Sequence, residues 1–176
     1  MAFEPIFEHW AGLRPLLKTA RTIIERDMEA ALDWSFGDLE PGPVYARIQY
    51  TQRHSQAFPL LVLQAASSTP EPLSGGVLQR HVIDCEIYLT RATQTGEDID
   101  TLAQDLIRYL DATMMCFLSA PATDWTAGFP AGADAGKIRV WCTNIVFGQL
   151  QQATERSGQY LHSVAFELQI DLIESE

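Results

Sequence analysis

Seven carboxylates stand within thirty-four residues near the middle of the chain, in the stretch RHVIDCEIYLTRATQTGEDIDTLAQDLIRYLDAT, residues 80–113. They are Asp84, Glu86, Glu97, Asp98, Asp100, Asp105 and Asp111. Carboxylates that converge away from water have shifted pKa values, and such clusters act as general acids and bases or hold divalent metal ions. Whether these seven can converge depends on the elements that carry them.

Asp84 and Glu86 are the pair best placed for such chemistry. Residues 81–90 have the period-two pattern of a strand, which puts both acids on one face and allows a paired-carboxylate site. A nuclease core of the restriction type would also need a lysine two residues after the second acid, where this chain has Tyr88. We therefore favour a solvated acidic surface and keep a metal-dependent enzyme that uses Asp84 and Glu86 as an alternative.

The other five acids have simpler explanations. Glu97, Asp98 and Asp100 crowd the expected start of a helix, where the helix dipole favours negative charge. Asp105 and Asp111 lie off the apolar stripe of that helix, so they are expected to face solvent. The same stretch lacks the mid-loop glycine and the terminal glutamate of a calcium-binding loop. We therefore expect no metal site at these five acids.

The histidines and cysteines show no ligand or catalytic spacing. They are His9, His54, His81, His162, Cys85, Cys116 and Cys142. No HxH, HExxH or CxxC pattern links them, so we expect buried thiols and core or interface histidines. Cys85 and His81 share a strand face, but no residue is evident to orient them as nucleophile and base. Phosphate-loop, dinucleotide and hydrolase motifs are also absent, so we expect no catalytic residue, no metal and no cofactor.

Composition bounds the class of protein. The 176 residues are 47% apolar and 20% charged, which is typical of one globular domain spanning residues 1–176. Twelve basic residues against 23 acidic ones give a net charge of −11, and so few cations disfavour specific nucleic-acid binding. No apolar run is long enough for a membrane helix, and acids stand where a signal peptide would be basic. We expect a soluble protein of cytoplasmic origin without membrane contact.

Two amphipathic helices and about five strands are predicted. Apolar residues recur at helical spacing within residues 1–34, mainly after residue 13, and again over 98–118. Strand patterns occupy 43–91 and 137–174, with a hairpin tip at 67–76 and a long loop at 119–136. This order favours an α+β fold, an antiparallel or mixed sheet with both helices packed on one face. At about 3.3 Å per residue, the last strand, 160–173, would project beyond a small core.

Several aromatic residues have no place in these elements. They are Phe3, Phe7 and Trp10 before the first helix, and Trp125 and Phe129 in the long loop. Burying each such side chain is worth about 1.5–3 kcal/mol, so a protein gains by covering them. They either fold back on their own sheet or dock on neighbouring subunits and partners. Both alternatives stay open, and the second makes these five the candidate interface residues.

Four segments together resemble bacteriophage tail terminator (tail completion) proteins and related neck proteins. The segments are FPLLVLQ at 58–64, HVIDCEIYLT at 81–90, TGEDIDTLAQDLIRYLDATM at 95–114 and VAFELQIDLI at 164–173. In that group a short helix precedes a sheet, a helix of the form LxxYLDA covers the sheet, and a long terminal strand closes it. The matching residues here include Tyr109, Leu110 and Asp111. The long loop 119–136 departs from the pattern of the group.

The resemblance implies a structural virion protein of the tail or neck, assembled in the host cytoplasm. It implies a homo-oligomer, commonly a hexameric ring, that caps the tail tube protein and joins it to the head–tail connector protein. It carries over no catalytic residue and no cofactor. DNA would pass through the lumen, and Asp84, Glu86 and Asp171 are candidates to line it and repel phosphate. The alternative is another neck, connector or tail-assembly adaptor, which would stay a monomer or dimer without its partner.

Overall fold

The computed structural model describes residues 13–51, 57–73, 76–91, 96–127, 138–156 and 159–175. Within these ranges the elements follow in the order α1 Leu13–Phe36, β1 Arg47–Gln49, β2 Leu60–Leu73, β3 Gly76–Arg91, α2 Gly96–Ser119, α3 Ala122–Ala127, β4 Ile138–Arg156 and β5 Gln159–Ser175. None of the described helices is both long and apolar enough to cross a membrane. This succession of helices and strands confirms the predicted α+β class.

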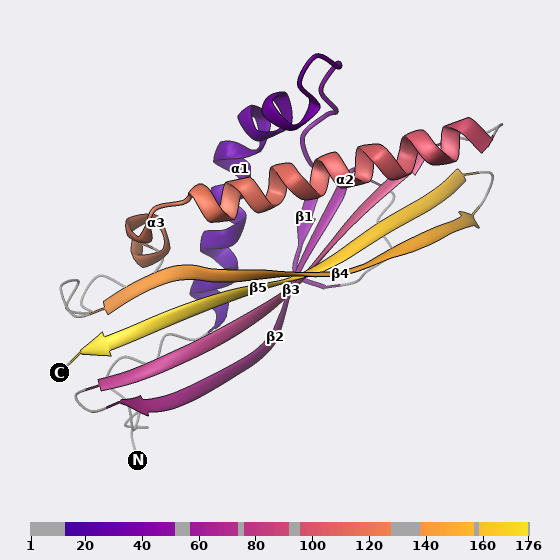
Figure 1. The fold of residues 1–176 in the computed structure, drawn as a ribbon. Coiled ribbons are helices and arrows are strands. Elements are labelled where there is room, and N and C mark those ends of the chain that lie inside the picture. Colours follow the sequence, from indigo (N-terminus) through magenta and orange to yellow (C-terminus); the bar gives the residue numbers. More distant parts are fainter. Residues whose placement is uncertain are drawn as a thin grey trace.

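The five described strands form one mixed sheet in the order β1-β2-β3-β5-β4. β1 pairs with β2 in parallel, and the other neighbouring strands are antiparallel. α1 and α2 cross each other over the sheet, and α3 follows the end of α2 (Figure 1). Successive residues of β3 and β5 therefore alternate between the side of the sheet that meets the helices and the opposite side.

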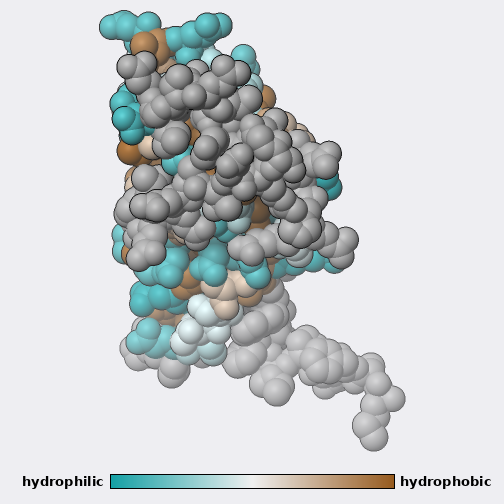
Figure 2. Space-filling view, turned by 90° about the vertical axis from the view of Figure 1, so that its right-hand side faces the viewer, coloured by the Kyte–Doolittle hydropathy of each residue, from teal (hydrophilic) through white to brown (hydrophobic). Residues whose placement is uncertain are grey.

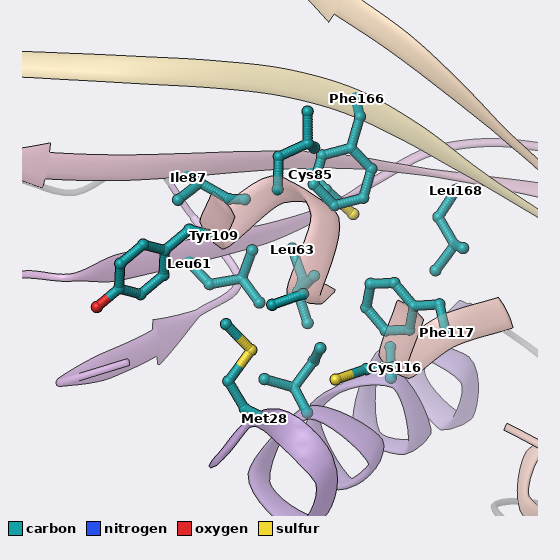
Figure 3. Close-up of a cluster of buried hydrophobic side chains, with 14 of the residues drawn as sticks. Met28, Leu61, Leu63, Cys85, Ile87, Tyr109, Cys116, Phe117, Phe166 and Leu168 are labelled. Carbon is teal, nitrogen blue, oxygen red and sulfur yellow. The ribbon is translucent and has the colours of Figure 1, made fainter. Parts of the chain in front are cut away.

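The core lies between the helices and the sheet. Alternate residues of β3 and β5 are buried there, among them Ile83, Cys85, Ile87, Phe166 and Leu168. Apolar residues of α1 and α2 pack against these strand residues from the helical layer (Figure 3). Because these helical residues are spaced three or four positions apart, one stripe of each helix faces the sheet. The periodicity that predicts the elements thus also determines which side chains are buried.

The β2–β3 hairpin is longer than its sequence indicates. Residues 67–76 have turn-like composition, but β2 continues to Leu73 and pairs with β3 as far as Gly76. β1 pairs only with the first three residues of β2, so the rest of β2, which includes Pro70 and Pro72, has no strand beside it on that side among the described residues. A proline lacks the N–H that a second neighbouring strand would need, so it is tolerated on an edge. The expected turn is therefore a paired strand.

The ends of other helices and strands also differ from those predicted from the sequence. At the start of the strand region expected over 43–91, the structure has only the short strand Arg47–Gln49. In the strand region expected over 137–174, the first strand is the long β4, Ile138–Arg156. The segment 119–136, expected to be a long loop, contains α3 near its start. The helix expected over 98–118 is found almost as predicted, as α2.

Candidate functional site

Three acids gather on the side of the sheet opposite the helices. The register of β3 and β5 places Asp84 directly opposite Glu167, and Glu86 opposite Ala165. Asp84 and Glu167 are exposed, and Glu86 is partly buried. They line a hollow of about 240 Å³ together with residues of β2. We call Asp84, Glu86 and Glu167 the acidic face.

Glu86 is held by its neighbours in the sheet. The Ser163 hydroxyl donates a hydrogen bond to Glu86 Oε1 at 3.1 Å. Burial, followed by a hydrogen bond to Glu86, raises the pKa of Tyr88 well above its ordinary value. Tyr88 therefore stays a neutral phenol, which can donate to a carboxylate. Glu86 is thus a fixed acceptor, whereas Asp84 extends into solvent.

Asp171 differs from the acids of the acidic face. Arg80 stands opposite it in the register of β3 and β5. The Arg80 guanidinium donates two hydrogen bonds to the Asp171 carboxylate, at 2.9 and 3.0 Å. A bidentate pair of this kind compensates the negative charge locally. Because the charge of Asp171 is already balanced within the chain, we do not include this residue in the acidic face.

The buried thiols and histidines are packed as core residues. Cys85 is buried, burial raises the pKa of its thiol well above normal, and its Sγ contacts the Ile83 carbonyl oxygen at 3.7 Å. His81 and His162 are also buried, and neither ring has a hydrogen-bond partner in the described part of the chain. Among the residues that the structure describes, no group of three His, Cys, Asp or Glu side chains could hold a metal ion.

A second feature is a cavity of about 460 Å³ near the end of α1. Its walls come from the last turn of α1, the loop 37–46, the residues before β2, the end of β3 and the first half of α2. The apolar lining residues are Phe36, Leu39, Pro43, Phe58, Pro59, Leu89 and Leu102. Glu40 and the ion pair of Asp105 with Arg108, at 2.8 Å, add charge to the lining. We call this cavity the end pocket.

The loop 37–46 is fastened to α2 by hydroxyl groups. The Tyr109 hydroxyl donates a hydrogen bond to the Pro43 carbonyl oxygen. The hydroxyls of Tyr45 and Thr113 share a hydrogen bond of 2.7 Å. Gly42 lies so close to α2 that an added Cβ would be 2.5 Å from Tyr109 Oη. These contacts make the loop a fixed wall of the end pocket.

Large apolar side chains are exposed in the last turn of α1 and in the loop that follows it. Trp34 is 61% exposed, Leu39 52% and Val44 49%. At the top of Figure 2, where the loop after α1 lies in Figure 1, hydrophobic surface stands directly beside hydrophilic surface. Exposed apolar area with a polar rim is typical of a protein–protein contact. This site is not evident from the sequence because several separate segments build it, although Leu39 and Val44 stand out as apolar residues in the turn-rich SFGDLEPGPV.

The predicted interface residues fall into two groups. Phe3, Phe7, Trp10 and Phe129 lie outside the described residues. Trp125 lies in α3 and is fully buried, with its ring centroid 6.1 Å from that of Phe117. The structure therefore fits the alternative in which this part of the chain folds back on its own core. Trp125 is corrected from an interface residue to a core residue.

Comparison with known proteins gives a likeness of fold. No family model matches the chain, and no curated protein matches it. The fold is similar to that of a solved chain described as "Virion of native gene transfer agent (GTA) particle". The TM-score is 0.50 at 12% sequence identity, and the alignment covers 93% of this chain and 99% of that chain. The likeness concerns the fold, and it extends over nearly the whole of both chains.

Proposed function

We propose that this chain is a structural virion protein, a tail terminator that forms a ring at the end of the tail tube. The observation that carries the proposal is the fold shared with a chain of the gene transfer agent virion over 93% of this chain and 99% of that one. Because nearly all of both chains align, the likeness includes the long strands as well as the helices. The four sequence segments that resemble tail terminators support the same function.

The length of the strands is consistent with a ring. β4 and β5 have 19 and 17 residues, whereas strands of about five or six residues are usual. At about 3.3 Å per residue, each spans on the order of 55–60 Å. This length exceeds what a core beneath two helices requires. Strands of this kind can line a channel or reach a neighbouring subunit.

The acidic face suits the lumen of such a ring. Copies of Asp84, Glu86 and Glu167 repeated around the ring would form a belt of negative charge. DNA phosphates are repelled by such a belt at short range. The genome would therefore slide past the ring without binding to it. The net charge of −11 is consistent with this behaviour.

The ring would contact two kinds of partner, the tail tube protein on one side and the head–tail connector protein on the other. The apolar surface around the end pocket is available for these contacts or for contacts between subunits. Phe3, Phe7, Trp10 and Phe129 remain part of the proposed interface. Trp125 is left out, because its own protomer buries it. This function needs no catalytic residue and no cofactor.

Another neck, connector or tail-assembly adaptor is the second candidate. The same likeness of fold supports it, because the description of the matching chain names the virion and not one component of it. An adaptor differs from a terminator in staying a monomer or dimer until its partner is present. The two candidates therefore differ in a measurable property of the purified protein.

The molar mass in solution separates these candidates. We expect light scattering of the chain alone to give a mass near six times the protomer mass of 19.6 kDa, and we expect an added tail tube protein to increase this mass by binding to the ring. Electron microscopy should show a ring, and the ring should stop growth of the tube. A chain that is monomeric alone but binds the tube or connector protein would favour an adaptor. A chain that stays monomeric in both conditions at high concentration would contradict the proposal.

A further inference from the structure

The charges of α1 run against its own dipole. Its first half carries Arg14 and Lys18, whereas its last turn carries Asp33, followed by Asp38 and Glu40 in the next loop. The last turn of α1 contains no basic residue, and the first turn contains no acidic one. A helix is stabilised by negative charge at its start and by positive charge at its end. The arrangement in α1 is therefore unfavourable in an isolated protomer.

These charges are also unpaired within the described chain. Arg14 and Lys18 are exposed, and neither forms an ion pair with a described residue. The acids at the other end, Asp33, Asp38 and Glu40, are likewise exposed and form no ion pair with the residues that the structure describes. Within the described part of the chain, the charges at both ends of α1 therefore lack a partner of opposite sign.

The opposite charges at the two ends of α1 cannot compensate each other within one protomer. α1 has 24 residues, and a helix of that length spans about 35 Å. Salt screens attraction over such a distance, because the Debye length is about 8 Å at physiological ionic strength. Between two copies, however, the start of one α1 can meet the end of the next. A contact between two different surfaces of one chain is heterologous, and it repeats until a ring closes.

The acidic end of α1 also offers apolar surface. Leu39 and Val44 are about half exposed, and the end pocket lies beside them. Protein interfaces combine an apolar centre with a polar rim, and complementary charge fixes which surfaces meet. The sequence that leads into the basic end contains Phe3, Phe7 and Trp10. Side chains of the kind that an apolar pocket accepts therefore adjoin the basic end in the sequence.

We propose that the subunit contact of the ring joins the basic start of α1 in one copy to the acidic rim of the end pocket in the next copy. Arg14 and Lys18 provide the basic side, and Asp38 and Glu40 provide the acidic side. The occupant of this surface is a second copy of the chain, and each copy uses one end for each neighbour. The inference rests on the proposed ring function and names the surface through which the ring closes.

Charge reversal at either end tests this contact. The basic-end variant is Arg14→Glu with Lys18→Glu, and the acidic-end variant is Asp38→Lys with Glu40→Lys. Each should raise the concentration at which half of the chains assemble by at least about tenfold. Both changes improve the match between charge and dipole in α1, so the thermal unfolding temperature should stay unchanged or rise. Weaker assembly with undiminished thermal stability separates loss of the contact from misfolding.

Recombining the variants gives a positive test. A chain with all four substitutions again has opposite charges across every contact, so it should regain assembly. The two double variants, which assemble poorly alone, should assemble when mixed, because alternate copies then carry opposite charges. The control is Glu29→Lys with Asp111→Lys, which changes the net charge as much as the acidic-end variant at two exposed positions. The control should assemble like the unmodified chain.

The outcomes distinguish this inference from the ring function itself. If the unmodified chain forms a ring and neither double variant shifts its assembly, the contact lies elsewhere and the inference is overturned while the ring function stands. If the unmodified chain never assembles, alone or with a tube protein, both fail. An assembly that stops at two protomers would overturn the heterologous contact, because the ends of α1 would then pair reciprocally.

Discussion

Asp84 and Glu167 lie directly opposite each other on the antiparallel strands β3 and β5, and both are exposed. Like charges in directly opposed positions destabilise a sheet, whereas opposite charges there stabilise it. On the same two strands, Arg80 and Asp171 have the favourable arrangement and share two hydrogen bonds. The sheet therefore bears an electrostatic cost at one position and avoids it at another. The unfavourable pair of Asp84 and Glu167 belongs to the acidic face.

Removing one of the opposed charges should stabilise the protomer. We expect Glu167→Gln to raise the free energy of unfolding by about 0.2–1 kcal/mol, because it keeps the shape and ends the repulsion from Asp84. Urea unfolding at low ionic strength measures this change, and added salt should reduce it. Glu29→Gln, at an exposed position on α1, is the control and should change stability less. A loss of stability in Glu167→Gln would show that the two acids do not repel.

Reversing the charge of the acidic face should slow passage of DNA. In particles carrying Asp84→Lys with Glu86→Lys, we expect slower genome ejection, because lysine attracts the phosphates that the acids repel. The ring should persist, which its molar mass can check. Asp84→Asn with Glu86→Gln is the control for loss of the negative charge alone: its amide oxygen can still accept from the Ser163 hydroxyl, and it should have a smaller effect. Unchanged ejection in the lysine variant would count against a lumen position for this face.

The close approach of Gly42 to α2 predicts a large effect of one added methyl group. We expect Gly42→Ala to lower the free energy of unfolding by about 1–3 kcal/mol, because its Cβ would lie 2.5 Å from Tyr109 Oη. In a Tyr109→Phe background this cost should shrink, and a double-mutant cycle measures the difference. Gly37→Ala is the matched control. It has φ +59°, and no atom of the described residues lies within 4 Å of the added Cβ, so its cost of about 1–2 kcal/mol should be the same in both backgrounds.

Trp125 should stabilise the protomer itself. Its ring is fully buried against Phe117, so we expect Trp125→Ala to lower the free energy of unfolding by about 3–5 kcal/mol. The measurement is made at a protein concentration below that of assembly. Trp34→Ala, at a position 61% exposed, should change protomer stability by less than about 0.5 kcal/mol. If Trp125→Ala weakened assembly and left the protomer equally stable, Trp125 would be an interface residue after all.

Local periodicity explains which elements could be predicted from the sequence. The apolar stripe of α2 repeats every three or four residues, so the predicted 98–118 lies within the observed Gly96–Ser119. β4 was predictable only in part. Three register shifts interrupt its pairing with β5, and at each shift the alternation of side chains between the two faces of the sheet is also interrupted. The second half of β2 was missed because its turn-like residues are held in a strand by pairing with β3. Pairing of this kind depends on distant residues, which outweigh local preference.

The candidate site shows the same limit. Alternation along β3 places Asp84 and Glu86 on one face, and this could be predicted. The register between β3 and β5 brings Glu167 to this face and gives Asp171 its partner Arg80, and the sequence alone does not set that register. The end pocket was harder still to predict, since the fold must first bring together the end of α1, the start of α2 and the loops beside them.

Buried histidines should make the stability of the protein depend on pH. His81 is fully buried, and no described residue forms a hydrogen bond with either of its ring nitrogens. Burial lowers the pKa of its imidazole below the ordinary 6.5, although the charge of Asp171 partly opposes this shift. Burial lowers the pKa of His162 as well. As the pH falls below about 6.5, the unfolded chain therefore binds protons that the folded chain does not, and the free energy of unfolding decreases.

Urea unfolding between about pH 7.5 and pH 5.5 measures this dependence, a range in which few other side chains titrate. The unmodified chain should be most stable at the upper end and lose stability steadily toward the lower end. His81→Leu should flatten the slope, because an uncharged side chain at this position binds no proton in either state. His81→Leu with His162→Leu should flatten it further. Equal stability of the unmodified chain at both ends of the range would show that neither imidazole is protonated more readily in the unfolded chain than in the folded one.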